Sequence, residues 1–160
     1  LEKCSEFFYI DEKEGTDTME EDLKKLYDEG KKAFGFYCGK GEWFLLTLKN
    51  IDFMSQMLPN VSKASQSLDV SVLHTLILEK IFGIDKENMA KQINLTYTKF
   101  FKEAIDGVDK GEFQCSFVLN PTRVTEIRDV AAAGEKMPQK STYFYPKMIT
   151  GMVMNNLGVD

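Results

Sequence analysis

The stretch Ala33-Phe-Gly-Phe-Tyr-Cys-Gly-Lys-Gly-Glu-Trp-Phe-Leu-Leu-Thr-Leu48 decides the fold class of this chain. Two aromatic or leucine-rich runs, 33–38 and 42–48, flank Gly39-Lys40-Gly41, and such a short glycine-containing connection is typical of a β-hairpin. These glycines do not form a phosphate-binding loop, because that motif needs Gly-x-x-x-x-Gly-Lys-Ser/Thr between a strand and a helix. The stretch therefore predicts an antiparallel hairpin.

Working outward from the hairpin, apolar residues at helical spacing and short apolar runs predict the other elements. Helices are predicted over 19–29, with Thr18 and Glu21 as a capping box, over 50–58, over 70–82 with Asp69 as the cap, and over 100–108. A short helix is predicted to begin at the cap Asp85. The last predicted helix starts at Asn120-Pro121 and ends at Gly134, and its expected buried residues are Val124, Ile127, Val130 and Ala131. The predicted strands cover 6–11, 94–98, 112–119 and 141–145, and residues 12–17 and 60–67 are expected to be loops. We predict a single α+β domain over residues 1–160, with a mainly antiparallel sheet packed by helices on one side.

The composition excludes several classes of protein. With 160 residues, 43% hydrophobic and 12% aromatic, the chain is too apolar to be disordered and long enough for one core. No apolar run approaches the roughly 18–20 residues of a membrane span, so no membrane partner is expected. The formal charge of −5 comes with no basic stripe, so no nucleic-acid partner is expected. The chain begins without Met, and we expect it to be a fragment of a longer protein.

The few cysteines and the single histidine bear on metal chemistry. Cys4, Cys38 and Cys115 are widely spaced, no Cys-x-x-Cys pair occurs, and His74 is the only histidine. A zinc site needs about four nitrogen or sulfur ligands, which the chain could supply only from distant positions. We therefore expect no metal, buried reduced thiols and a cytoplasmic location, and the sequence names no cofactor.

Two segments carry the groups that could bind an anion. Arg123 follows the predicted helix start at Asn120-Pro121, where free amides and the positive end of the helix dipole attract negative charge. The second segment combines cations and hydroxyls, namely Lys140, Ser141, Thr142 and Lys147. If the loop 135–142 folds back toward the helix start, the two segments form one site for a phosphate or carboxylate. The alternatives are an ordinary helix cap and an edge strand with solvated lysines.

His74 is a weak candidate for a catalytic base. It lies on the predicted apolar helix, within one and a half turns of Asp69 and Ser71, which could share a mouth with it. The alternative is a core histidine bonded to the backbone. Methionines near the end of the chain, including Met152 and Met154, indicate either gap-filling in a core or a subunit contact.

Three stretches resemble the carboxy-terminal part of the bacterial and archaeal "domain of unknown function 1015" proteins. They are Phe36–Phe44, Leu68–Glu79 and, most specifically, Leu119–Met148 with its Lys-Ser-Thr-Tyr-Phe-Tyr-Pro-Lys run at 140–147. The resemblance implies a C-terminal domain of a longer, nucleotide-linked and kinase-like protein. The upstream Asp-Gly-His-His-Arg motif of that family is absent from this chain, so no catalytic role transfers to it.

Two functions follow from these observations. In the first, the domain binds an anionic, phosphate-like or nucleotide-like ligand, or completes such a site in a larger protein, with no independent enzymatic activity. In the second, it is a non-catalytic scaffold or dimerisation module. The expected partners are an upstream domain of the same protein and a second copy of the chain.

Overall fold

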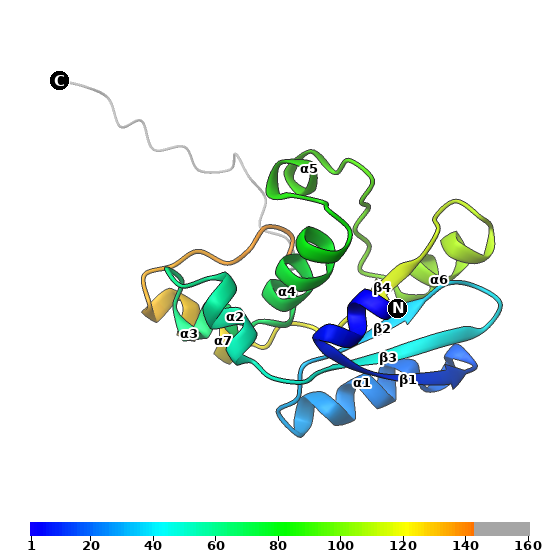
Figure 1. The fold of residues 1–160 in the computed structure, drawn as a ribbon, viewed down its shortest axis with the longest axis horizontal. Helices are drawn as coiled ribbons and strands as arrows, with labels where there is room; N and C mark the ends of the chain where they lie inside the picture. Colours follow the sequence, from blue (N-terminus) through cyan, green and yellow to red (C-terminus); the bar gives the residue numbers. More distant parts are fainter. Residues whose placement is uncertain (143–160) are drawn as a thin grey trace, which may run out of the picture.

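The predicted hairpin is the centre of a four-stranded antiparallel sheet (Figure 1). The structure, a computed structural model, describes residues 1–142. Strands β1 (Phe8–Glu14), β2 (Ala33–Tyr37), β3 (Glu42–Leu48) and β4 (Ser116–Val118) lie in the order β1-β3-β2-β4. Tyr37 pairs with Trp43, and the φ angles of Gly39, Lys40 and Gly41 are 98°, 63° and 78°. Glycine adopts this left-handed conformation without strain, so the hairpin and its turn are confirmed.

Helices occupy most of the remaining chain. Within residues 1–142 they are η1 (Glu2–Glu6), η2 (Thr16–Thr18), α1 (Met19–Asp28), α2 (Asp52–Met57), α3 (Lys63–Gln66), α4 (Asp69–Val72), η3 (Leu73–Ile81), α5 (Lys86–Lys91), α6 (Phe101–Asp109) and α7 (Val124–Ala132). Helix η3 is a π-helix that continues directly from α4. None of these helices is both long and apolar enough to cross a membrane. The α+β class predicted from the sequence is confirmed.

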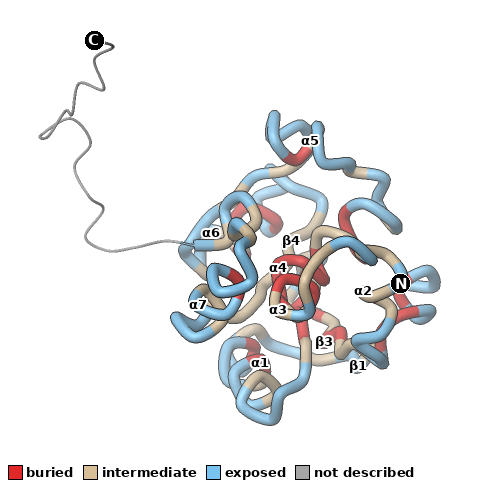
Figure 2. The backbone as a smooth tube through the Cα atoms, turned by 90° about the vertical axis from the view of Figure 1, so that its left-hand side faces the viewer, coloured by how far each residue is buried: buried red, intermediate tan, exposed pale blue. Residues whose placement is uncertain are grey.

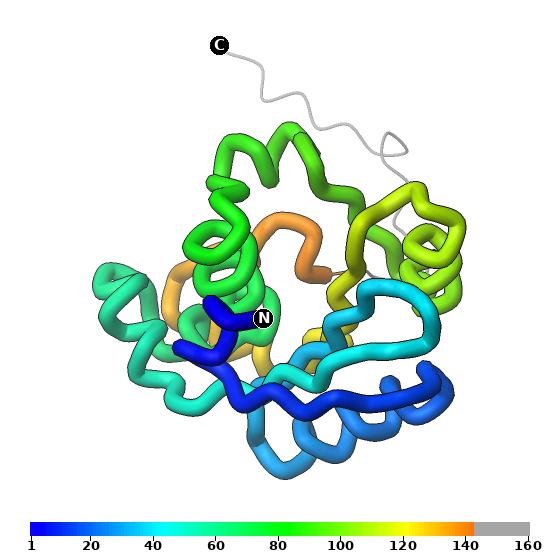
Figure 3. Tube along the Cα trace, turned by 45° about the vertical axis from the view of Figure 1, so that its right-hand side comes forward, coloured from blue at the N-terminus to red at the C-terminus, as the bar shows by residue number. Residues whose placement is uncertain are grey.

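Both faces of the sheet are buried, which corrects the expectation that helices cover one side. One face packs Phe8, Phe34 and Leu46 against Leu76 and Ile77 of η3. The opposite face packs residues of the hairpin against α1 and α6; this second cluster contains Met19, Leu23, Ala33, Tyr37, Trp43, Leu45, Ile105 and Val108. Figures 1 and 3 show α1 and α4 on opposite sides of the sheet. Figure 2 shows the buried residues concentrated between these layers. The hairpin is apolar at successive positions because both of its faces are covered.

Several predicted boundaries differ from the structure. The first strand begins at Phe8 and continues to Glu14. Its last residues are charged, a pattern that predicts a loop in the sequence, but charged side chains are compatible with an edge strand that is half exposed to solvent. The segment 60–67 contains α3, which begins where Ser62 accepts a hydrogen bond from the Ser65 amide. Residues 94–98 form no strand, and only Ser116–Val118 of the predicted strand 112–119 pair with β2. Most of the predicted strand 141–145, with Met152 and Met154, falls outside the described residues.

The predicted helix caps were right in one case and wrong in three. Asp85 accepts a hydrogen bond from the Asn88 amide and caps α5 as predicted. Thr18 makes no capping hydrogen bond, and Asp69 lies inside α4, which starts after Leu68.

The third wrong cap lies at the start of α7. This helix begins at Val124, not at Asn120-Pro121, because the Asn120 side chain donates to the Leu23 carbonyl of α1 at 3.1 Å. Its buried stripe is also narrower than predicted, since Val124 is 78% exposed, Ala131 is exposed and only Val130 is fully buried.

The buried face of β2 predicts a large difference between two aromatic truncations. Phe34 is fully buried and packs edge-on against Phe8, with ring centroids 6.0 Å apart, whereas Tyr9 of β1 is 61% exposed. We expect Phe34→Ala to lower the free energy of unfolding by about 3–5 kcal/mol, because it leaves a cavity in the core. The control Tyr9→Ala should cost far less. Equal losses in urea denaturation would contradict this account of the core.

Candidate functional site

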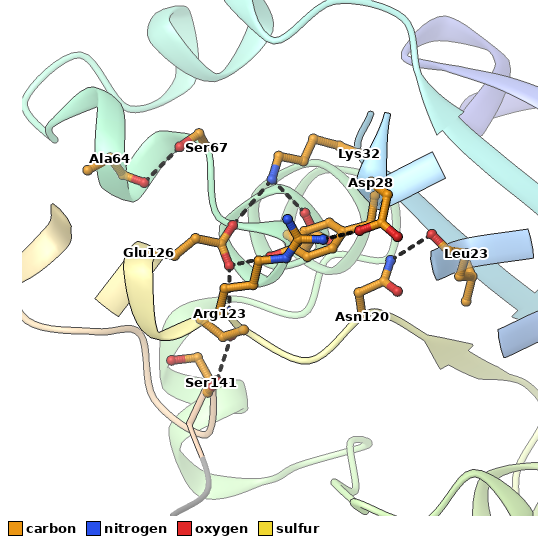
Figure 4. Close-up of polar contacts among 12 residues, drawn as sticks. Leu23, Asp28, Lys32, Ala64, Ser67, Asn120, Arg123, Glu126 and Ser141 are labelled. Atoms are coloured by element: carbon orange, nitrogen blue, oxygen red, sulfur yellow. Dashed lines mark hydrogen bonds and ion pairs between the residues drawn. The ribbon is translucent and has the colours of Figure 1, made fainter. Parts of the chain in front are cut away.

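A cluster of buried charges lies where α1, the start of α4 and the start of α7 meet (Figure 4). The Lys32 ammonium, just before β2, lies 2.9 Å from Asp69 Oδ1 and 3.5 Å from Glu126 Oε1. The side chains of Lys32 and Asp69 are only 16% and 7% exposed. Burial raises the pKa of Asp69, and the nearby Lys32 ammonium opposes that rise. Oδ2 of Asp69 has no hydrogen-bond partner within residues 1–142. Lys32 therefore stabilises the charged form of Asp69 against the cost of its burial.

Tyr27 connects the carboxylates of this cluster to α1. Its hydroxyl donates to Glu126 Oε2 at 2.5 Å, and the same oxygen accepts the Arg123 backbone N–H at 2.9 Å. Burial raises the pKa of Tyr27, and the hydrogen bond to the Glu126 carboxylate adds to the rise. Glu126 thus caps the first turn of α7 and joins it to α1.

Arg123, the first of the expected anion ligands, is engaged within the protein. Its guanidinium forms an ion pair with Asp28 and lies 4.1 Å from the centroid of the Tyr27 ring. Hydrogen bonds from Lys24 and then Arg123 lower the pKa of Asp28. Figure 4 shows the Arg123 side chain directed toward Asp28. Arg123 is about half exposed, but its charge already faces a carboxylate.

The loop that carries the other expected ligands does fold back toward residues 120–123. The Thr122 hydroxyl donates to the Ser141 carbonyl at 2.9 Å, and the Ser141 hydroxyl donates to the Pro138 carbonyl at 2.6 Å. Lys140 and Thr142 are exposed, and Lys140 has a left-handed φ of 62°. No contact between Arg123 and Lys140 occurs among the polar contacts of residues 1–142. Lys147 lies outside the described residues.

Glu135 fixes the other end of this loop against α3. Its carboxylate accepts hydrogen bonds from the backbone and the hydroxyl of Ser62, each at 2.7 Å, and from the Ser65 hydroxyl. These bonds, the Ser65 bond first, lower the pKa of Glu135. The loop 135–142 is therefore held at both ends, by Glu135 and by Ser141.

His74 has no catalytic partner in the described part of the chain. It is half-buried, its ring centroid lies 6.4 Å from that of Tyr97, and its Nε2 is buried without a hydrogen-bond partner there. Burial lowers the pKa of His74, which favours the neutral ring. Asp69 and Ser71, the residues expected to share a mouth with it, are both 7% exposed, so they line no open mouth.

Arg123, Lys140, Ser141 and Thr142 line neither of two surface hollows found in residues 1–142. One hollow is lined by Glu21, Lys24, Lys25, Asp28 and Glu29, and the other by Met57, Leu58, Thr75, Glu79, Lys80 and Lys86. The same part of the chain contains no group of three or more His, Cys, Asp or Glu side chains placed to hold a metal ion.

Sequence reasoning missed four members of the charged cluster as a set: Tyr27, Lys32, Asp69 and Glu126. The sequence marks Asp69 as a helix cap and as a possible neighbour of His74, and it places Glu126 within a predicted helix without assigning it a partner. The sequence contains one weak indication of this cluster. An aspartate at the N-terminus of an apolar helix needs a nearby cation when the first turn of that helix is buried. Nothing in the spacing identifies Lys32 as that cation.

Comparisons with known protein families, curated proteins and solved structures found no match. The resemblance to the domain of unknown function 1015 proteins therefore stays a prediction from the residues.

The buried pair predicts a pH-dependent defect in one lysine variant. We expect Lys32→Met to lower the free energy of unfolding at pH 7 by about 3 kcal/mol, because it leaves the buried Asp69 carboxylate without a cation. The folded-state pKa of Asp69 lies above its usual 3.8. Its ionisation therefore costs stability as the pH rises from 3.8 through the folded-state pKa, and the defect should shrink on acidification.

Denaturation of three variants checks this expectation. Lys24→Met removes an exposed lysine from its pair with Asp28 and should have little effect at any pH. Adding Asp69→Asn to Lys32→Met should recover part of the lost stability. An unchanged defect between pH 4 and pH 7, or no recovery in the double variant, would show that Lys32 and Asp69 are not coupled.

Proposed function

We propose that this chain is a non-catalytic interaction module that pairs with a second copy through the outer edge of β4 and the aromatic side chains beside it. One observation carries the proposal: buried or stacked ion pairs engage the Lys32 and Arg123 cations, whereas exposed aromatic rings lie beside an edge of β4 with which no other strand of residues 1–142 pairs. Charges paired inside a protein contribute little to ligand binding, while aromatic side chains are enriched at protein interfaces.

The aromatic row consists of Phe44, Phe36, Phe117 and Phe82, on β3, β2, β4 and the end of η3. Neighbouring ring centroids along this row are 6.2, 4.8 and 5.8 Å apart. Three of the rings are half-buried, and Phe82 is 45% exposed. The row therefore runs across the sheet and ends at the accessible ring of Phe82. An aromatic side chain that is exposed on a monomer and packed on other rings can act as an apolar anchor at a protein interface.

The edge of β4 supports a partner of the same kind. Within residues 1–142, β4 pairs only with β2, so its other edge offers unpaired backbone groups. Phe113, just before this strand, is 40% exposed and adds to the apolar border. A strand edge can meet the same edge of a second copy across a two-fold axis, which makes a closed dimer.

The family resemblance supplies the other occupant of this surface. If the chain is a C-terminal domain, an upstream domain of the same cytoplasmic protein is the competing partner. The measurement below separates the two, because a second copy is present in a solution of this chain alone and an upstream domain is not.

Two matched substitutions test the module. We expect the chain to show a concentration-dependent dimer mass by light scattering after size exclusion, and Phe82→Lys to remain monomeric, because it places a charge at the exposed end of the aromatic row. Tyr9→Lys introduces the same charge at an exposed aromatic position on β1, the opposite edge of the sheet, and should still dimerise. A wild-type chain that stays monomeric at every concentration, or a Tyr9→Lys chain that loses the dimer equally, would overturn the proposal.

A second candidate function is binding of an anion at the loop 135–142. The hydrogen bond between Thr122 and Ser141 favours it, because that bond brings together the two segments from which the ligands are expected. Lys140 and Thr142 are exposed beside this bond, and Lys140 forms no ion pair with another residue of 1–142 that a phosphate would have to break.

Titration with inorganic phosphate and with ATP, followed by NMR, tests the second candidate. We expect Lys140→Ala to weaken binding several-fold, because it removes an exposed cation next to Ser141. Lys102→Ala, which removes an exposed lysine of α6, is the control and should leave the affinity unchanged. Equal affinities of the Lys140→Ala and wild-type chains would exclude an anion site at this loop.

A further inference from the structure

Cys38 directly follows the last paired residue of β2, and Cys115 directly precedes the first paired residue of β4. The antiparallel register joins Phe36 to Phe117 and Tyr37 to Ser116. One further step in this register places Cys38 across from Cys115. Residues directly opposite in an antiparallel pair have Cα atoms about 4.5–5.5 Å apart, which falls within the roughly 4.4–6.8 Å span of disulfides.

The two thiols also share one face of the sheet. Side chains alternate along a strand, so Cys38 lies on the face of Phe36, and Cys115 lies on the face of Phe117. The rings of Phe36 and Phe117 stack with centroids 4.8 Å apart, which shows that these positions project to the same side.

The surroundings of the three cysteines differ. Cys38 is exposed, Cys115 is half-buried and Cys4 is buried. Burial raises the pKa of Cys115, and the negative charge of a Cys38 thiolate raises it further, in agreement with the proximity that the register implies. Cys4 belongs to the core cluster on η3 and provides an internal control.

We propose that Cys38 and Cys115 are a redox modification site, forming a reversible cross-strand disulfide that locks β4 to β2. This inference is independent of the proposed dimer, because it rests on the register within one chain. The expectation of buried reduced thiols is wrong in its burial for Cys38, which is exposed and therefore accessible to an oxidant.

The reaction balances with a small disulfide such as oxidised glutathione as the oxidant. The Cys38 thiolate attacks one glutathione sulfur, the glutathione S–S bond breaks, and the first glutathione leaves as a thiolate that takes up a proton. The Cys115 thiolate then attacks Cys38 Sγ and releases the second glutathione in the same way. Two protein thiols are oxidised to one disulfide, and one glutathione disulfide is reduced to two thiols.

The disulfide would act mainly on the stability of β4. This strand has three residues and pairs only with β2 among residues 1–142, so little backbone bonding holds it. A cross-link between positions so far apart in sequence closes a long loop and removes entropy from the unfolded chain. Oxidation should therefore raise the Tm by roughly 5–15 °C.

Oxidation of the full chain with glutathione disulfide, followed by intact mass and thiol counting, tests the proposal. We expect the monomer to lose two hydrogen atoms in mass and two of its three titratable thiols, and non-reducing digestion to yield a linked pair of peptides containing Cys38 and Cys115. Cys4→Ser should form the same disulfide, whereas Cys38→Ser and Cys115→Ser should not form it and should show no rise in Tm on oxidation.

Three results would overturn the proposal. They are a stable glutathione adduct on Cys38 with the Cys115 thiol intact, a disulfide between two chains, and a disulfide that contains Cys4. Peptide mapping of the wild-type chain distinguishes all three, so the test does not depend on the folding of any variant.

Discussion

The ammonium of Lys32 is the charge on which the packing of three helices depends. It lies between Asp69 of α4 and Glu126 of α7, and 5.3 Å from the ring centroid of Tyr27 in α1. A buried carboxylate without a cation costs several kcal/mol, so α4 can approach the sheet at this point only with Lys32 beside it. A buried ion pair adds little net stability compared with apolar packing. Its main consequence here is therefore the relative placement of α1, α4 and α7.

The same network explains why the cations near α7 are poorly suited to a ligand. Arg123 lies over the Tyr27 ring and pairs with Asp28, while Lys32 is shared by two carboxylates. An incoming phosphate would have to displace a carboxylate from either cation. Its binding free energy would then include only the difference between the new ion pair and the one that it replaces. The exposed Lys140 has no such competitor among the polar contacts of the described chain. The packing thus separates structural cations, which hold helices, from a solvent-facing lysine that remains available.

The parts of this fold that depend on neighbouring residues could be predicted from the sequence, and those that depend on distant partners could not. The hairpin follows from apolar runs around Gly39 and Gly41, and the Asp85 cap from a bond to an amide three residues away. Asp69 and Asn120 carry the same local signal for a cap, yet their side chains bond to Lys32 and to the Leu23 carbonyl. Tertiary partners of this kind leave no trace in spacing, so the charged cluster emerged only from the structure.

The two edges of the sheet differ in a way that makes β4 the better suited of the two to pair with another strand. Strand β1 is seven residues long and carries Asp11, Glu12, Lys13 and Glu14, the last three of which lie in the stretch 12–17 that the sequence predicts as a loop. Charged side chains on an exposed edge discourage pairing with another strand. Strand β4 has three residues, carries Phe117 and is bordered by exposed Phe113 and Phe82. A strand this short has few backbone hydrogen bonds to its neighbour. Any contact that buries its aromatic rings or cross-links its end therefore stabilises it. Partner binding and the Cys38–Cys115 bond would both stabilise β4 in the sheet. Oxidation and assembly could therefore be coupled, because each would favour the state in which β4 is paired.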